Sequence, residues 1–193
     1  IQEHRVRHYA SLYQPAYYEI LNEPSQYAEF SAVAEPEGET LVDAWIAQAV
    51  RLSEAVQEES PGTRVGVSLG LQQELDEQLY VRLLELDAID FIGFRLFQPA
   101  AFEVLEDMFA EFGHPADYGK DILIMETWFG ACLAPQRSQE LDAKWLEMTA
   151  AFAAKERMQA VLASDFGCFV TEGGTRTATS SSGSWKRSIS ATV

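Results

Sequence analysis

Two glutamates occupy positions from which a pair of carboxyl groups could do acid and base chemistry. Glu23 directly follows the strand-like run 17–21, and Glu126 directly follows the run 121–125. In parallel α/β folds the carboxyl ends of the strands carry the active site, so we expect both glutamates at one edge of a sheet. Such a pair suits glycoside hydrolysis, in which one carboxyl stays protonated and donates to the leaving oxygen. The other stays ionised and attacks the anomeric carbon.

Five short apolar runs typical of strands alternate with four amphipathic runs typical of helices. The expected strands cover 17–21, 64–69, 89–97, 121–125 and 159–163, and the expected helices cover 40–60, 74–86, 99–112 and 138–156. This alternation predicts an α/β fold with a parallel sheet and helices outside it. Either an open doubly wound sheet or part of a (β/α)8 barrel fits the pattern. No G-x-G-x-x-G motif follows the first expected strand, and the sequence has no G-x-x-x-x-G-K-[ST] motif. Their absence removes the main support for a nucleotide-binding sheet.

The charge of the chain narrows the classes of partner. Lys and Arg number 14 against 30 Asp and Glu, which gives a formal net charge of −16. This balance argues against nucleic acid and against an anionic membrane surface. The acidic run 29–39 would repel an anionic polysaccharide and so favours a neutral glycan. No apolar run approaches the roughly 18 residues of a membrane span, and the first residues are polar, so no transmembrane helix or signal peptide is expected.

Three segments resemble parts of a known enzyme family. The run 18–24, Tyr-Glu-Ile-Leu-Asn-Glu-Pro, resembles the Asn-Glu-Pro motif that closes strand four of clan A glycoside hydrolases, the cellulase-type (β/α)8 barrels. The run 119–126 is similar to strand seven of that clan with its lead-in, and 89–94 looks like strand six. The resemblance covers roughly 17–166. It implies a partial (β/α)8 (TIM) barrel that holds strands four to eight.

The resemblance also implies roles for single residues. It makes Glu23 the acid/base and Glu126 the nucleophile, and it places Asn22 in contact with the 2-hydroxyl of the sugar that is cleaved. The implied reaction is hydrolysis of a β-linked, neutral oligo- or polysaccharide with retention, by a double displacement at two glutamates. It requires no metal and no organic cofactor.

Five further residues are candidates for binding the carbohydrate. Trp128 is either a stacking platform for a sugar or an aromatic side chain packed under a loop, and Tyr27 could line a further sugar site. Asp165 could hydrogen-bond a sugar hydroxyl. The clan often has a Tyr or His near the end of strand six, but Arg95 and Phe97 lie there in this sequence. Arg95 could take over that role through an ion pair that lowers the pKa of a glutamate.

The resemblance leaves part of a barrel unaccounted for. We expect 1–172 to form the C-terminal part of the hydrolase domain and the Ser/Thr/Gly-rich 173–193 to form a poorly ordered tail. Strands one to three of the barrel have no counterpart in this sequence. We therefore expect the open edges of the sheet to be covered either by a missing N-terminal segment or by self-association. The compartment stays open, with secretion slightly favoured. Cys132 and Cys168 either form a disulfide or remain two thiols.

Two alternative functions remain from the sequence. One is a non-catalytic carbohydrate-binding relative with the same fold. The other is an α/β interaction or structural domain in which the Asn-Glu-Pro run is accidental. This second alternative predicts that Glu23 and Glu126 lie far apart or face different directions.

Overall fold

The structure, a computed structural model, describes residues 2–26, 40–71, 74–128 and 139–163 of the chain. In these residues one parallel sheet runs in the order β1-β2-β3-β4-β5, which is also the order of the strands in the sequence. The strands are β1 (Tyr17–Asn22), β2 (Arg64–Leu69), β3 (Phe91–Leu96), β4 (Asp121–Thr127) and β5 (Ala160–Ala163). A doubly wound sheet would reverse its strand order at a switch point. The prediction of a partial (β/α)8 barrel is therefore confirmed.

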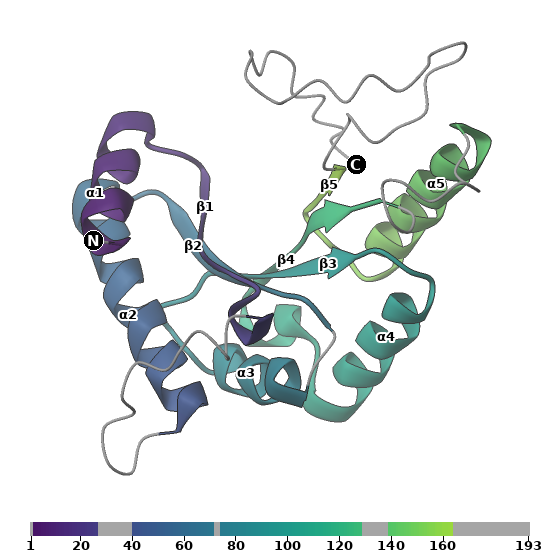
Figure 1. The fold of residues 1–193 in the computed structure, drawn as a ribbon, viewed down its shortest axis with the longest axis horizontal. Coiled ribbons are helices and arrows are strands. Elements are labelled where there is room, and N and C mark those ends of the chain that lie inside the picture. Colours follow the sequence, from purple (N-terminus) through teal and green to yellow (C-terminus); the bar gives the residue numbers. More distant parts are fainter. Residues whose placement is uncertain (1, 27–39, 72–73, 129–138, 164–193) are drawn as a thin grey trace.

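Helices follow the strands and form an arc along one face of the sheet (Figure 1). They are α2 (Leu41–Glu59), α3 (Glu74–Leu84), α4 (Ala100–Phe112) and α5 (Gln139–Lys155), which match the four predicted helices closely. A further helix, α1 (Gln2–Tyr13), precedes β1 and packs beside α2, and a short 3-10 helix, η2 (Pro115–Tyr118), precedes β4. The sequence did not predict α1, because Val6 and Ala10 are its only buried residues and give no readable apolar stripe.

Local sequence signals explain where α2 begins. The backbone N–H of Asp43 donates to the Thr40 hydroxyl at 3.2 Å, and the Asp43 carboxylate accepts from the Thr40 backbone N–H at 3.4 Å. These reciprocal bonds form a capping box, which satisfies donors that the first turn of a helix leaves free. Thr40 is therefore the N-cap of α2.

One side chain of α5 lies on the other side of its helix from where the sequence places it. Helical spacing predicts Met148 on the buried side, but Met148 is 42% exposed. Thr149 is buried instead, and its hydroxyl donates to the Trp145 carbonyl at 2.8 Å. A threonine can be buried in this way because the preceding turn satisfies its hydroxyl, so a pattern built on apolar residues alone misplaces the stripe.

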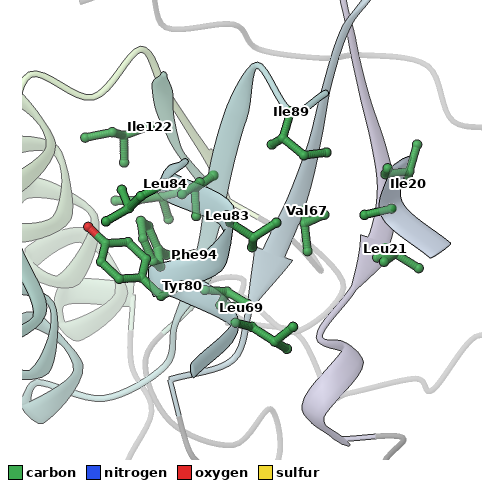
Figure 2. Close-up of a cluster of buried hydrophobic side chains, with 14 of the residues drawn as sticks. Ile20, Leu21, Val67, Leu69, Tyr80, Leu83, Leu84, Ile89, Phe94 and Ile122 are labelled. Atoms are coloured by element: carbon green, nitrogen blue, oxygen red, sulfur yellow. The ribbon is translucent and has the colours of Figure 1, made fainter. Parts of the chain in front are cut away.

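The main core lies between the sheet and its helices. Val67, Leu69 and Phe94 point from β2 and β3 toward Leu83 and Tyr80 of α3 (Figure 2). All five side chains are at most 2% exposed. Burial of each of the larger ones stabilises the fold by about 1.5–3 kcal/mol relative to an exposed side chain. This core fixes the sheet on which the polar residues of the opposite face are mounted.

The opposite face of the sheet is curved, as the face of a partial barrel must be. At the amino ends of the strands, the Tyr17 hydroxyl of β1 donates to the Asp121 carboxylate of β4 at 2.7 Å. Arg64 of β2 forms an ion pair with the same carboxylate at 2.6 Å. A side chain of the first strand reaches the fourth only because the sheet bends between them. The same bend brings the carboxyl ends of β1 and β4 together.

Candidate active site

One arginine lies among three glutamates at the carboxyl end of the sheet. Arg95, at the end of β3, has its Nε atom 3.6 Å from Oε2 of Glu23 and its Nη2 atom 3.4 Å from Oε1 of Glu19. Its Nη1 atom forms an ion pair with Oε2 of Glu126. Only 8% of Arg95 is exposed. A single guanidinium therefore contacts both candidate catalytic carboxylates, so they lie close together on one face.

Glu126 reaches this face through an irregularity in β4. Phe94 pairs with Ile124, but the next residue, Arg95, pairs with Glu126, so Met125 is an extra residue in the ladder. In a regular strand successive side chains alternate between the two faces, and Arg95 would then pair with Met125. The bulge therefore brings Glu126 into register with Arg95.

A second irregularity acts in the same way on β1. Glu19 pairs with Gly66 and Asn22 pairs with Ser68, with one extra residue between these pairs. Asn22 thus shares the face of Ser68, whose hydroxyl lies 3.4 Å from the Asn22 side-chain oxygen. Asn22 is exposed at this edge, as the proposed contact with a sugar hydroxyl requires.

Glu23 is held in an uncommon backbone conformation directly after β1. Its φ of 43° lies in the left-handed region, which costs a residue with a side chain roughly 1–2 kcal/mol. Its N–H donates to the Ser68 carbonyl at 2.9 Å, and the Gln26 side chain donates to its Oε1 atom at 2.8 Å. A Cβ on Gly70 would lie 2.7 Å from the same oxygen. Glycine at position 70 therefore leaves the space that the Glu23 carboxyl occupies.

The surroundings of Glu23 favour its protonated form. Burial raises the pKa of Glu23 above its ordinary value, Arg95 opposes the change, and the nearby carboxylates of Asp76 and Glu19 reinforce it. Arg95 lowers the pKa of Glu23, as expected of an ion-pair partner, but burial outweighs the guanidinium at 3.6 Å, so the pKa is raised on balance. A raised pKa is the direction of shift that a general acid requires.

The raised pKa of Glu23 predicts a pH-dependent difference in stability between the wild type and Glu23→Gln. Below the ordinary glutamate pKa both side chains are neutral, so the two proteins should unfold alike. As the pH rises through the raised pKa of Glu23, the wild type loses the stability that its protonated carboxyl contributes, whereas the variant does not. Urea unfolding at about pH 4 and pH 8 should show Glu23→Gln gaining stability relative to the wild type. An equal difference at both pH values would contradict this assignment.

Two aromatic rings pack against each other at the carboxyl ends of β3 and β4. Phe97 follows β3 and Trp128 follows β4, and their ring centroids are 4.3 Å apart with an interplanar angle of 34°. Both residues are half-buried, so the pair is packed but keeps accessible surface. Of the candidate residues, Asn22, Glu23, Arg95, Phe97, Glu126 and Trp128 thus come to the same edge of the sheet. Tyr27, Asp165 and both cysteines lie outside the described residues.

Sequence reasoning missed two acidic residues at this site. Glu19 lies within β1 and contacts Arg95, and Asp76 in the first turn of α3 is 1% exposed and accepts a 2.6 Å hydrogen bond from the Ser25 hydroxyl. A charged residue inside an apolar strand was a readable signal for Glu19. Asp76 had no such signal, because acidic residues are common at the start of helices.

Other features of the described residues lie apart from this cluster. A cavity of about 330 Å³, lined by residues that include Gln57, Thr63 and Asp90, lies near the amino end of β2 rather than beside the glutamates. Within the described ranges, no group of three or more His, Cys, Asp or Glu is placed to hold a metal ion. None of the helices described is both long and apolar enough to cross a bilayer.

Solved structures with a similar fold include a xylanase and a glucosidase. An endo-1,4-beta-xylanase from Caldicellulosiruptor owensensis superposes with a TM-score of 0.55 at 16% identity, covering 83% of this chain and 54% of the xylanase chain. A glucosidase from Croceicoccus marinus gives 0.56 at 9% identity, covering 83% of this chain and 38% of the glucosidase. The native structure of CbXyn10B superposes with a TM-score of 0.54 at 14% identity, covering 83% of this chain and 54% of the CbXyn10B chain.

The likeness is one of fold. The chain spans about half the length of the xylanase and of CbXyn10B, and less of the length of the glucosidase. Its sequence matches no model of a known protein family. It also matches no curated protein. The resemblance seen in the sequence is therefore confirmed at the level of the barrel architecture, through three-dimensional similarity rather than sequence identity.

Proposed function

We propose that this chain, which has the fold of part of a clan A glycoside hydrolase barrel, carries the catalytic glutamates of a retaining β-glycoside hydrolase. The contact of Arg95 with both Glu23 and Glu126 at the carboxyl ends of the strands supports this function most strongly. Acid and nucleophile must flank one glycosidic bond, and a guanidinium in contact with both carboxyl groups supports such an arrangement.

In this mechanism the two carboxyl groups have opposite protonation states at the start. Glu126, paired with the guanidinium, is the anion whose oxygen attacks the anomeric carbon and forms a glycosyl ester. Glu23 donates its proton to the glycosidic oxygen as the bond to the leaving sugar breaks. Glu23, now a carboxylate, then takes a proton from a water molecule, and that water's oxygen displaces Glu126 from the anomeric carbon. The configuration is retained because it is inverted twice.

The substrate class that we propose is a neutral, β-linked oligo- or polysaccharide. The net charge of −16 would repel an anionic polymer at long range. The Phe97–Trp128 pair offers an aromatic surface to the apolar C–H face of a sugar ring. The named activities of the similar structures make β-1,4-linked xylose and glucose oligomers the first substrates to test.

The test is hydrolysis of this panel by the purified chain, followed by NMR of the first anomer released. We expect a product that first appears in the β configuration, and loss of turnover in Glu23→Gln with retained folding. Tight binding of an oligosaccharide with no hydrolysis at any pH would instead favour the non-catalytic carbohydrate-binding alternative. Full turnover in Glu23→Gln would contradict the role given to this residue.

The proposed sugar platform leads to a separate prediction. Trp128→Ala removes one ring of the pair, and the loss of an aromatic contact of about 1 kcal/mol corresponds to a roughly fivefold rise in KM. The chemical step does not involve the ring, so kcat should fall much less. The matched control is Tyr9→Ala, which removes a 47% exposed ring from α1 and should leave KM unchanged. An unchanged KM in Trp128→Ala would mean that its ring serves only packing.

A further inference from the structure

We propose that Glu19 is a positioning residue that holds the Arg95 guanidinium toward Glu126 and limits its contact with Glu23. Its catalytic meaning rests on the proposed function, but its effect on the charges of the site does not. The three nitrogens of Arg95 face three different carboxylates. How the guanidinium is shared among them sets which carboxyl stays ionised and which keeps a proton.

Glu19 is itself fixed in place from the neighbouring strand. The Ser68 hydroxyl of β2 donates to Oε1 of Glu19. The same oxygen lies 3.4 Å from Nη2 of Arg95. Ser68 is fully buried, and the Glu19 side chain is 22% exposed. This hydroxyl bond restrains the carboxylate from swinging into solvent, so it stays available to Arg95.

The contacts of Arg95 leave Glu23 with the weakest share of the positive charge. Nη1 and Nη2 face Glu126 and Glu19, whereas Nε, 3.6 Å from Glu23, forms no hydrogen bond with any described residue. Three carboxylates around one guanidinium leave excess negative charge, which one bound proton relieves. Glu23 is the most buried of the three, so the proton is held there at least cost.

Charged and polar groups from three elements and from the segment after β1 face Glu23, and they determine the sign of the expected change. Arg95 of β3 attracts its carboxylate, Glu19 of β1 and Asp76 of α3 repel it, and the Gln26 side chain donates to it. Replacing Glu19 by glutamine removes one repelling charge and frees the guanidinium to move toward Glu23. Both changes favour ionised Glu23, so both lower its pKa.

The test follows the ionisation of Glu23 directly by carboxyl ¹³C NMR, with the signal assigned from its loss in Glu23→Gln. In Glu19→Gln we expect the titration midpoint of Glu23 to fall by roughly half a pH unit or more. Glu19→Asp keeps the charge but withdraws it from Arg95. The titration midpoint of Glu23 in this variant should therefore lie between its values in the wild type and in Glu19→Gln. Glu103→Gln removes an exposed carboxylate from α4 and should leave the midpoint unchanged. A midpoint that stays constant or rises in both Glu19 variants would overturn the proposal.

This readout separates the inference from the proposed function. A fall in the midpoint with no loss of turnover in Glu23→Gln and Glu126→Gln would support the role of Glu19 and refute the hydrolase mechanism. Where hydrolysis is measured, the basic limb of the kcat/KM profile should move to lower pH in Glu19→Gln by the same amount as the midpoint. A basic limb that does not move while both catalytic variants are inactive would overturn the role of Glu19 alone.

Discussion

Glu126→Gln should lower kcat on a β-linked oligosaccharide by roughly 10⁴-fold or more, while the protein stays folded. The amide of glutamine is neutral and cannot attack the anomeric carbon, but it retains the size of the side chain and can still accept a hydrogen bond from Arg95. Steady-state kinetics on the oligomer panel measure the loss, and circular dichroism and thermal unfolding show whether the fold is kept.

Two controls make this result specific to the carboxylate at position 126. Glu147→Gln removes an exposed carboxylate from α5 and should leave kcat within about twofold of the wild type, since surface substitutions are usually near neutral. In Glu126→Ala, added azide should occupy the vacated position and attack the anomeric carbon once. The product should then be a glycosyl azide of inverted configuration. A Glu126→Gln variant that keeps kcat within tenfold of the wild type would rule out Glu126 as the nucleophile.

The second large effect is expected on stability, from Arg95→Met. Removing one partner of a buried ion pair typically costs about 3–5 kcal/mol, because the remaining charges stay buried without compensation. We expect the lower end of this range, since the side chains of Glu19 and Glu126 are 22% and 20% exposed and keep some contact with water. Urea unfolding at about pH 8 measures this loss.

The same variant should recover part of its stability in acid, through Glu23. Without the guanidinium, nothing opposes the effect of burial on Glu23, so its pKa should rise further above the ordinary value. The part of the loss that comes from Glu23 therefore grows as the pH rises from the ordinary glutamate pKa through the raised one, and it is small at about pH 4. The matched control is Arg82→Met, which breaks an exposed pair with Asp43 and should cost much less, because water screens the two charges. Equal losses for both variants at pH 8 would contradict the central place of Arg95.

The strands and most helices could be predicted because their signals are local. The run Arg64–Leu69 has Val65, Val67 and Leu69 at alternate positions, and it coincides with β2. Thr40 and Asp43 mark the start of α2 by themselves. The helix α1 escaped prediction because two buried residues make no stripe, and Met148 was misplaced because a buried threonine takes the position that the pattern reserves for an apolar residue.

The candidate site could be predicted in outline but not in its contacts. A position directly after a strand places Glu23 and Glu126 at one edge, and the structure confirms that placement. The extra residue Met125, which brings Glu126 opposite Arg95, depends on pairing between strands that no local pattern reveals. The contact of Glu19 with Arg95 depends on the bend of the sheet. The catalytic roles themselves stay predictions.

One measurement tests the central claim most directly, namely that Glu126 forms a covalent bond with the sugar. A 2-deoxy-2-fluoro β-glycoside of xylose or glucose, activated by a dinitrophenyl leaving group, reacts to form the glycosyl ester and releases it slowly. Digestion and mass spectrometry then locate the label. The account predicts one sugar on the peptide that contains Glu126, and none on that peptide in Glu126→Gln. A label on Glu23 or elsewhere, or turnover that gives the inverted product without any label, would contradict it.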